Sequence, residues 1–539
     1  MSLTDEEEIV KKTWTARSAA FVLSAALAGQ TLATGFVPQD VQAAQEGTQE
    51  STTETGKLID MKAAIAPVEA SYGYYVDVYQ TNTSANLTPE SNASIGVLSK
   101  MLDIFTPGDD WNNGTVLDQT THQANLDKVT EITANRTEEE KTRAYLDDRR
   151  NQNYSMTEGL GGYAQTFIDG AEVQTSITDT IPEDATTVKY NDAYGDNAPW
   201  ANTDGTYGNI AKLVNTIRGG AASTSSAKKY YKYMRPFRWL DDSVILDTLV
   251  PCKKADPSND GGYPSGHTNA ANLAAIGMAY AVPERYQELL TRASELGYDR
   301  IVAGMHSPLD VMGGRVMSTA VAAANLYDAD NADVKSAAVK DGQALVQTKE
   351  SGTDRFSDYG QNKKDYTDRL TYGFAQTGDT TKAMRVPKGA EVLLESRLPY
   401  LTADQRREVL YTTGLPSGYP VLDDEEGWGR LNLFAAADGY GALYSDVTVD
   451  MEAANGGFSA ADEWKNDIAG GGSLTKEGSG SLTLSGNNSY TGGTDIHDGI
   501  IDAADDTALG TGNVTNGAEL DVDSTLQVGG DYTQSADAS

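Results

Sequence analysis

The sequence is poor in cysteine and histidine, with one cysteine and four histidines among 539 residues. The single cysteine, Cys252, excludes an intramolecular disulfide. No nearby residue offers a base that would activate its thiol, so we expect Cys252 to be a small buried apolar residue rather than a nucleophile. With so few histidines, two that fall inside anion-binding patterns carry much of the functional signal.

Positive charge is also scarce. Lysine and arginine total 42 against 78 acidic residues, which gives a formal net charge of −36. A surface this negative repels a polyanion, so nucleic acid is excluded as an expected partner. The hydrophobic fraction of 39% is low for a globular chain, and 53 glycines indicate a repetitive or loop-rich stretch. The length exceeds what one core supports, so we expect several structural units.

Long apolar runs are missing outside the N-terminus. An alanine-rich run at 18–28 follows the basic stretch 11–17, and small residues at 41–43 offer a cleavage site. These features predict a secretory signal over 1–43 and a flexible lead-in over 44–57, with an ordinary alanine-rich helix as the alternative. No other stretch approaches the roughly 18 apolar residues that span a bilayer. We therefore expect a secreted, periplasmic or cell-surface protein that is not membrane-spanning after signal cleavage.

Between residues 58 and 444 the sequence has a helical pattern. Thr137 and Glu140, and again Thr402 and Gln405, are spaced as capping boxes that begin helices. Runs of small and apolar residues predict further helices suited to close packing. The predicted helices are 138–150, 269–282, 309–327 and 403–412. We therefore expect a mainly α-helical domain over 58–444.

The composition changes after about Ser445. In 473–494 apolar residues alternate with hydroxyl residues between Gly and Asn turns, and similar short runs follow. This pattern predicts a solenoid of stacked β coils over 445–539. Each coil needs neighbours to bury its face, so we expect the array to be cut short or uncapped. Because coils stabilise one another, we also expect removal of the chain beyond about Asp450 to cost the helical part little.

A positive island lies at 228–254, where seven Lys or Arg residues face three Asp residues. Such an island concentrates anions, although by composition alone it is equally typical of a solvated basic helix face. Within it Lys228 and Arg235 are seven residues apart, about two helical turns, so both face one side if this stretch is helical. The Arg fork grips phosphate oxygens in pairs, and Lys adds a point charge.

His306 stands in the pattern Arg300-x5-His306-x3-Asp310 and is followed by Ser307-Pro308. Ser as a cap and Pro at the first helical position predict that His306 lies just before a helix N-terminus, a location that favours anions. Asp310 is then able to accept a hydrogen bond from one ring nitrogen, which leaves the other to attack phosphorus. A lone histidine near a helix start usually has a structural role, but the pairing with Arg300 and Asp310 favours catalysis.

The second histidine pattern is Pro264-Ser265-Gly266-His267, which precedes a predicted helix at Thr268. The His267 ring is able to donate to a leaving-group oxygen. The N–H groups of Gly266 and His267 and the Ser265 hydroxyl are candidates for phosphate contacts. Taken alone, these four residues are more often a plain loop-to-helix turn.

Taken in chain order, the residue patterns around Lys228, His267 and His306 resemble the three motifs of the type 2 phosphatidic acid phosphatase (PAP2) superfamily. The three motifs are Lys228-x6-Arg235-Pro236, Pro264-Ser265-Gly266-His267 and Arg300-x5-His306-x3-Asp310. This superfamily includes bacterial class A non-specific acid phosphatases, lipid phosphatases and vanadium haloperoxidases. The motifs cover only about 228–315, but three in order at these spacings are highly specific.

The resemblance implies a helical-bundle catalytic domain, a metal-free site and a phosphohistidine intermediate. It implies that His306 is the nucleophile, Asp310 its orienting partner and His267 the general acid. The implied phosphate-binding residues are Lys228, Arg235, Ser265, Gly266 and Arg300. Members usually have Ser before the third-motif arginine, where this chain has Asp299. That extra carboxylate either weakens phosphate binding or orients the Arg300 guanidinium.

Residues 473–528 resemble the β-helical repeats of autotransporter passenger domains. The pattern is Leu-x-Lys-x-Gly-x-Gly-x-Leu-x-Leu-x-Gly followed by Tyr-x-Gly-Gly-Thr. The resemblance is good over one repeat. It implies a secreted or surface-attached setting, with cell-surface association through the repeat region.

These features together predict a secreted acid phosphatase that hydrolyses small phosphomonoesters, without a cofactor and with vanadate as an inhibitor. One alternative is a vanadate-dependent haloperoxidase, in which the same eight residues hold vanadate as a prosthetic group. Another is a non-catalytic surface protein or adhesin, against which the intact His267, His306 and Asp310 argue. A lipid phosphatase is disfavoured, because those relatives are polytopic and this sequence offers no spanning helices.

Overall fold

The computed structural model describes residues 56–195, 197–523 and 525–539. The predicted signal at 1–43 and the lead-in up to residue 55 lie outside these described residues. The α-helices are α1 (Met61–Ala64), α2 (Tyr75–Val78), α3 (Ala93–Gly96), α4 (Gln119–Asn135), α5 (Glu138–Arg149), α6 (Gln152–Met156), α7 (Ala164–Gly170), α8 (Gly208–Ile217), α9 (Ser225–Tyr231), α10 (Pro236–Trp239), α11 (Gly266–Ala281), α12 (Tyr286–Val302), α13 (Pro308–Tyr327), α14 (Ala332–Val346), α15 (Tyr359–Thr371), α16 (Ala403–Thr412) and α17 (Leu433–Ala436). The β-strands are β1 (Phe105–Thr106), β2 (Thr115–Val116), β3 (Ala442–Leu443), β4 (Val447–Asp450), β5 (Ala461–Trp464), β6 (Ala469–Gly470), β7 (Leu474–Glu477), β8 (Ser481–Leu484), β9 (Thr494–Ile496), β10 (Ile500–Ala503), β11 (Val514–Asn516), β12 (Glu519–Val522) and β13 (Tyr532–Gln534).

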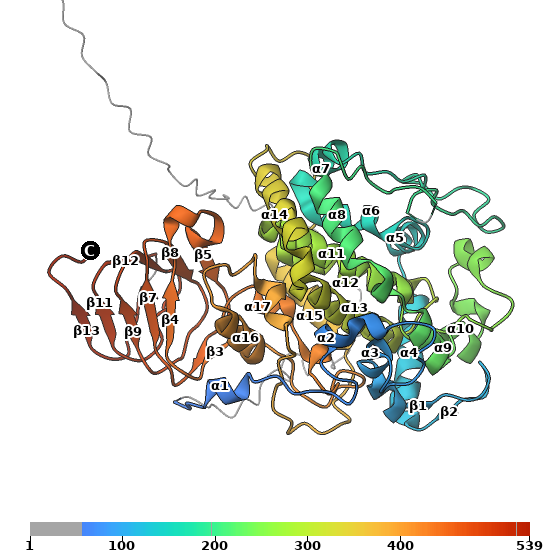
Figure 1. The fold of residues 1–539 in the computed structure, drawn as a ribbon, viewed down its shortest axis with the longest axis horizontal. Coiled ribbons are helices and arrows are strands. Elements are labelled where there is room, and N and C mark those ends of the chain that lie inside the picture. The colour runs from blue at the N-terminus through green and yellow to red at the C-terminus, as the bar shows by residue number, and fades with distance from the viewer. Residues whose placement is uncertain (1–55, 196, 524) are drawn as a thin grey trace, which may run out of the picture. The chain divides into compact units, whose positions relative to one another are not determined.

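Helices α11, α12 and α13 form the centre of the helical part, and α11 packs against both of the others and against α8 (Figure 1). Small residues allow this close packing. A Cβ atom at Gly277 of α11 would lie 3.2 Å from the Val214 side chain of α8. Almost all of α13 is buried, which places its N-terminal end, and with it the third motif, inside the protein.

The helices predicted from the sequence are confirmed with small shifts at their ends. The capping boxes of Thr137 with Glu140 and of Thr402 with Gln405 are both formed, at the starts of α5 and α16. The predicted helix 269–282 begins three residues earlier, because Ser265 is the N-cap of α11. Within the described part of the chain, no helix is both long and apolar enough to cross a bilayer.

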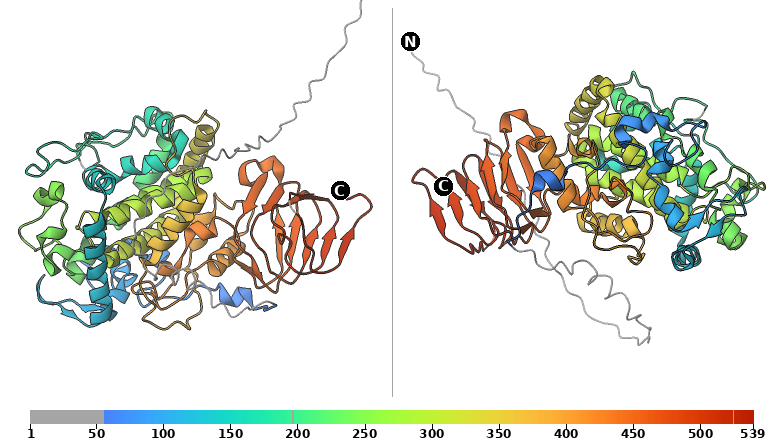
Figure 2. Two further views of the ribbon diagram at one scale, coloured as in Figure 1. Left: turned by 180° about the vertical axis from the view of Figure 1, so that it is seen from behind. Right: turned by 60° about the horizontal axis from the view of Figure 1, so that its bottom comes forward.

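The predicted β-solenoid is also confirmed. Two parallel sheets run in the orders β12-β10-β8-β5 and β13-β11-β9-β7-β4. Each coil is 20 residues long, as the paired residues Leu474, Thr494 and Val514 show. Equivalent residues of successive coils therefore lie side by side in the sheet. Both views of Figure 2 show these strands stacked as successive coils towards the C-terminus. The fold is thus a mainly helical part followed by a short β-solenoid.

The first coils of the solenoid are joined to the helical part by buried polar contacts. Arg397 Nη1 lies 2.7 Å from Asp462 Oδ2, and both residues are buried. Tyr400 donates to the same carboxylate at 2.6 Å, and Trp464 Nε1 donates to the Tyr400 hydroxyl at 2.8 Å. The described residues accordingly form one compact unit. These contacts argue against the expectation that the β region can be removed at little cost.

Truncation after Asp450 is instead expected to lower the melting temperature of the helical part. The cut removes Asp462 and Trp464, so Arg397 and Tyr400 lose their partners in the solenoid. In Asp462→Ala the solenoid stays and the Arg397 charge is buried without its partner, a situation that typically costs about 3–5 kcal/mol. Circular dichroism melts of the truncated chain and of an Asp462→Ala variant measure this loss. Asp521→Ala is the matched control, because Asp521 is an exposed acidic residue of β12. Equal melting temperatures of Asp462→Ala and Asp521→Ala would contradict the prediction.

Candidate active site

The third motif lies where α12 ends and α13 begins. Arg300 is in the last turn of α12, and His306 lies in the short link that follows. Ser307 is the N-cap of α13 and Pro308 its first residue, as the sequence predicts. The backbone N–H of Ser307 donates to Asp310 Oδ2 at 2.9 Å, which completes a capping box. The local sequence therefore places the His306 ring over the first turn of a buried helix.

His306 is held from both sides of its ring. Nδ1 lies 3.2 Å from Asp310 Oδ2, and Nε2 lies 3.0 Å from Arg235 Nη1. Because arginine only donates, Nε2 must be the accepting nitrogen and Nδ1 the protonated one. Burial and then the charges of Arg235 and Lys228 hold the pKa of His306 well below its ordinary value. The ring is therefore neutral, with the nitrogen lone pair on Nε2, which is the form that attacks an electrophile.

Asp310 is fully buried beside this ring. Burial raises its pKa to about 6, against the stabilising hydrogen bond from the Ser307 N–H. A Cβ atom at Gly262 would lie 2.8 Å from Asp310 Oδ2, so only glycine lets the backbone approach the carboxylate this closely. The backbone N–H of Ser265 donates to the Asp310 carbonyl at 2.8 Å, which ties the second motif to the third.

Lys228 and Arg235 do not share one helix, contrary to the expectation for a continuous helical stretch. Helix α9 ends at Tyr231, because Lys232 adopts a left-handed conformation with φ of 49°. Arg235 is instead the N-cap of α10, and its Nε donates to Asp260 at 2.7 Å. Lys228 Nζ donates to the Gly261 carbonyl at 2.6 Å. Burial and then the charge of Arg235 lower the pKa of Lys228 to about 7.

The second motif begins α11. The Ser265 hydroxyl accepts from the Thr268 N–H at 3.3 Å and from its hydroxyl at 2.9 Å, so it serves mainly as a helix cap. His267 is half-buried in the first turn of α11, next to Gly266. Burial and then the charge of Arg300 lower the pKa of His267 to about 3. The His267 ring is therefore neutral.

Sequence reasoning missed Asp148, a residue of α5 that contacts both Arg300 and His267. Its carboxylate is buried and binds Arg300 Nη1 and the adjacent Arg149. Its backbone carbonyl lies 3.2 Å from His267 Nε2. Although burial opposes ionisation, Arg300 and then Arg149 hold the pKa of Asp148 well below its ordinary value. Among the described atoms, the buried Arg300 Nε has no hydrogen-bond partner, so this guanidinium keeps one donor for another acceptor.

Asp299, the departure from the usual motif, is directed away from Arg300. Its two carboxylate oxygens accept from Arg143 Nε and Nη2 at 2.7 and 2.9 Å. The partner of Arg300 is Asp148. Asp299 therefore neither weakens phosphate binding nor orients the Arg300 guanidinium by direct contact.

A small cavity of about 90 Å³ brings the motifs together. It is lined by Asp148, Arg149, Arg235, Phe237, Cys252, Lys253, Lys254, Asp260, His267, Arg300 and Met305. Each of the three motifs thus contributes a lining residue. His306, Asp310 and Lys228 are not among the lining residues, and His306 is linked to the cavity through its contact with Arg235. Cys252 is half-buried and packs against the hydrophobic core, in partial agreement with the expectation of a buried apolar residue, and it also lines this cavity. Its pKa is raised, mainly by burial, which keeps the thiol protonated and a poor nucleophile.

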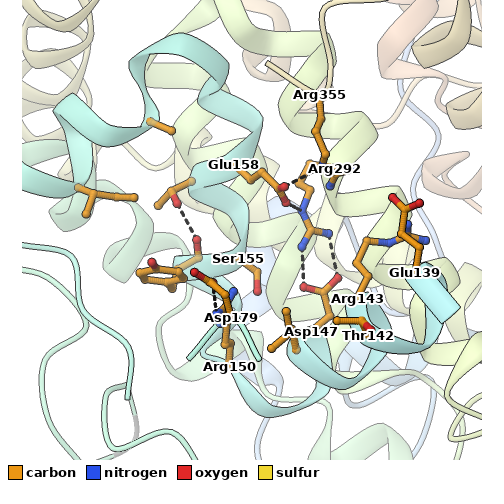
Figure 3. A pocket seen from close by; sticks show the side chains of 15 residues that line it. Glu139, Thr142, Arg143, Asp147, Arg150, Ser155, Glu158, Asp179, Arg292 and Arg355 are labelled. Atoms are coloured by element: carbon orange, nitrogen blue, oxygen red, sulfur yellow. Dashed lines mark hydrogen bonds and ion pairs between the residues drawn. The ribbon is translucent and has the colours of Figure 1, made fainter. Parts of the chain in front are cut away.

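A larger cavity of about 610 Å³ lies along α5, where its lining includes Glu139, Arg143 and Asp147. Figure 3 shows Arg292 of α12 between Asp147 and Glu158. The described residues that line this cavity include none from the three motifs. Its buried ion pairs brace α5 against α12, and this keeps Asp148 opposite Arg300.

Comparisons with known proteins agree with the two parts of the fold. The PAP2 superfamily model matches residues 209–332, and the Passenger-associated-transport-repeat model matches 474–503. The chain therefore contains a PAP2 superfamily domain and an autotransporter-type repeat.

Three relatives illustrate these similarities. The chain is 41% identical over 107 residues to a non-specific acid phosphatase of Salmonella typhi, covering 19% of this chain and 40% of the relative. It is 32% identical over 115 residues to a non-specific acid phosphatase of Providencia stuartii, covering 21% and 44%. It is 34% identical over 127 residues to the Neisserial autotransporter lipoprotein NalP of Neisseria meningitidis serogroup B, covering 23% and 12%. The chain thus spans about two fifths of the length of the acid phosphatases that it matches.

Proposed function

We propose that the protein is an acid phosphatase that hydrolyses phosphomonoesters through a phosphohistidine at His306. The observation that carries this proposal is the ordered contact Asp310–His306–Arg235, which sets one ring nitrogen as a donor and the other as a nucleophile. Similarity to non-specific acid phosphatases supports a phosphatase activity.

In the first step the phosphoryl group enters the cavity. The Arg235 N–H that donates to His306 Nε2 then donates to a phosphate oxygen instead. Nε2 attacks phosphorus in line with the ester bond, a P–N bond forms and the P–O bond to the leaving group breaks. Lys228, Arg235 and Arg300 stabilise the charge on the equatorial oxygens. Asp310 stabilises the imidazole as its ring becomes cationic.

The leaving oxygen takes a proton from His267. Because burial and the Arg300 charge lower its pKa to about 3, His267 acquires this proton when the phosphate charge offsets the cations around the ring. In the second step a water molecule loses a proton to His267 and attacks phosphorus, the P–N bond breaks and inorganic phosphate is released.

The dependence of kcat/KM on pH is expected to report Lys228. This lysine is charged below its pKa of about 7 and neutral above it, so phosphate affinity falls as the pH rises through about 7. A Lys228→Arg variant keeps its charge and is expected to move this alkaline limb to higher pH. Profiles of both proteins on phenyl phosphate measure the shift, and the substrate's own titration cancels in the comparison. Identical alkaline limbs would contradict the role of Lys228.

An assay of the purified chain on phenyl phosphate at mildly acidic pH tests the proposed function. We expect phosphate release that persists in excess EDTA and is inhibited competitively by vanadate, which resembles the transferring phosphoryl group. Among the described residues, no group of three His, Cys, Asp or Glu side chains is placed to hold a metal ion. Loss of activity in chelator with recovery on adding zinc or magnesium would contradict the mechanism. Halide oxidation by the vanadate-loaded protein with added hydrogen peroxide as the oxidant, without phosphate release, would favour a haloperoxidase.

We also propose that the protein acts outside the cytoplasm on small phosphorylated compounds and associates with the cell surface through its repeat region. The similarity of that region to autotransporter repeats supports this setting. Cell fractionation followed by detection of the protein on intact cells, with and without protease treatment, tests it.

A further inference from the structure

The catalytic cavity is small relative to a phosphoester. Its volume of about 90 Å³ equals the space of roughly three water molecules at ≈30 Å³ each. A phosphoryl group fills this space, so the organic part of a bound phosphomonoester lies at the cavity mouth. Among the residues that line the cavity only Lys254 is exposed, which places it at this mouth, next to the leaving group.

The cations that line the cavity are almost all matched by carboxylates. The described ion pairs are Arg149 and Arg300 with Asp148, Arg235 with Asp260, and Lys253 with Asp242. Lys254 also lines the cavity, but among the described residues it has no carboxylate within ion-pair distance. Its Nζ has only a 3.4 Å contact with the Asn259 carbonyl, and the side chain is exposed. Lys254 therefore carries the unmatched positive charge of the mouth.

The backbone of Lys254 is fixed relative to the catalytic groups. Arg238 Nη2 donates to the Lys254 carbonyl at 2.8 Å and to Asp260 Oδ2 at 2.8 Å. The other oxygen of Asp260 accepts from Arg235, which contacts His306. One connected set of contacts thus holds both the phosphate-binding arginine and the base of the Lys254 side chain.

We propose that Lys254 is a specificity-determining residue that binds a second anionic group on the leaving group. This inference rests on the proposed phosphatase function and defines its substrate class. The preferred substrates are phosphomonoesters whose organic part carries a carboxylate or a second phosphate. In a protein with a net charge of −36, a local cation at the mouth offsets the repulsion that such a substrate meets elsewhere.

Three matched substrates test this proposal: phenyl phosphate and its para-carboxylate and para-phosphate derivatives. For Lys254→Ala we expect kcat/KM on the two anionic derivatives to fall about threefold relative to phenyl phosphate, in the range of an exposed ion pair of about 0.2–1 kcal/mol. For Lys254→Glu we expect roughly tenfold, since repulsion replaces attraction. At high salt, which screens an exposed pair, the loss of kcat/KM on the anionic derivatives relative to the loss on phenyl phosphate should disappear. Comparing ratios between variants cancels the intrinsic reactivity of each leaving group.

Lys340→Glu is the matched control, because Lys340 is an exposed residue of α14 that does not line the cavity. It changes the net charge as Lys254→Glu does, and its ratio is expected to equal that of the unchanged protein. A loss on both anionic derivatives assigns the subsite to anions in general, and a loss on the para-phosphate alone assigns it to phosphate. Equal losses on all three substrates, or the same ratio for Lys340→Glu, would overturn the proposal. If the unchanged protein fails to hydrolyse even phenyl phosphate, the proposed function falls, and the subsite falls with it.

Discussion

Replacing His306 by alanine is expected to abolish turnover of phenyl phosphate, with a loss of several orders of magnitude in kcat. His306 has Asp310 on one ring nitrogen and the cavity arginine Arg235 on the other. No second imidazole has both contacts among the described residues, so the variant retains phosphate-binding cations but has no nucleophile. Steady-state kinetics measure the loss, and rapid acid-free quenching with labelled substrate measures the phosphoenzyme.

His267→Ala separates the nucleophile from the proton donor. This variant is expected to form a phosphoenzyme from substrates with good leaving groups, because those groups depart without protonation. The label should be acid-labile and base-stable, as expected for a P–N bond. His497→Ala, which changes an exposed histidine of the solenoid paired with Glu477, should retain full activity. Labelling of this kind that persists in His306→Ala would rule out His306 as the nucleophile.

The parts of the site that the sequence predicts are those that depend on local signals. Ser307, Pro308 and Asp310 form a cap within a few residues, so the start of α13 and the place of His306 follow from short-range chemistry. The α11 cap at Ser265 follows in the same way. Helix periodicity and the strand spacing of the repeats similarly predict the two parts of the fold.

The parts that the sequence does not predict depend on long-range pairing. Asp148 is 152 residues before Arg300, and nothing in its own helix distinguishes it from its acidic neighbour Asp147. Asp299 is likewise matched by Arg143, 156 residues away. The break at Lys232 was equally hidden, because a non-glycine residue with positive φ has no reliable sequence signal. Only the packing of α5 against α12 brings these charges together.

Asp148 is expected to position Arg300 and to support protonation of His267. Its carboxylate holds the guanidinium, and its negative charge and backbone carbonyl both favour a protonated His267. In Asp148→Ala the cavity is more positive by one charge, so ground-state binding of phosphate is not weakened. The guanidinium loses its orientation and His267 becomes harder to protonate, so we expect kcat to fall about a hundredfold, the scale of a misplaced catalytic group. KM should stay level or fall, and steady-state kinetics together with inhibition by inorganic phosphate measure this split.

Asp147→Ala is the matched control for this prediction. Asp147 precedes Asp148 on α5 and is equally buried, but it pairs with Arg292 in the larger cavity rather than with a motif residue. Breaking either buried ion pair leaves an uncompensated arginine, so both variants should melt at lower temperature. Asp148→Ala alone should lose most of its kcat per folded molecule, with a shifted pH profile because His267 titrates lower. If kcat falls equally in the two variants, or KM rises in proportion to the lost kcat/KM, Asp148 acts through stability alone and not through the position of Arg300.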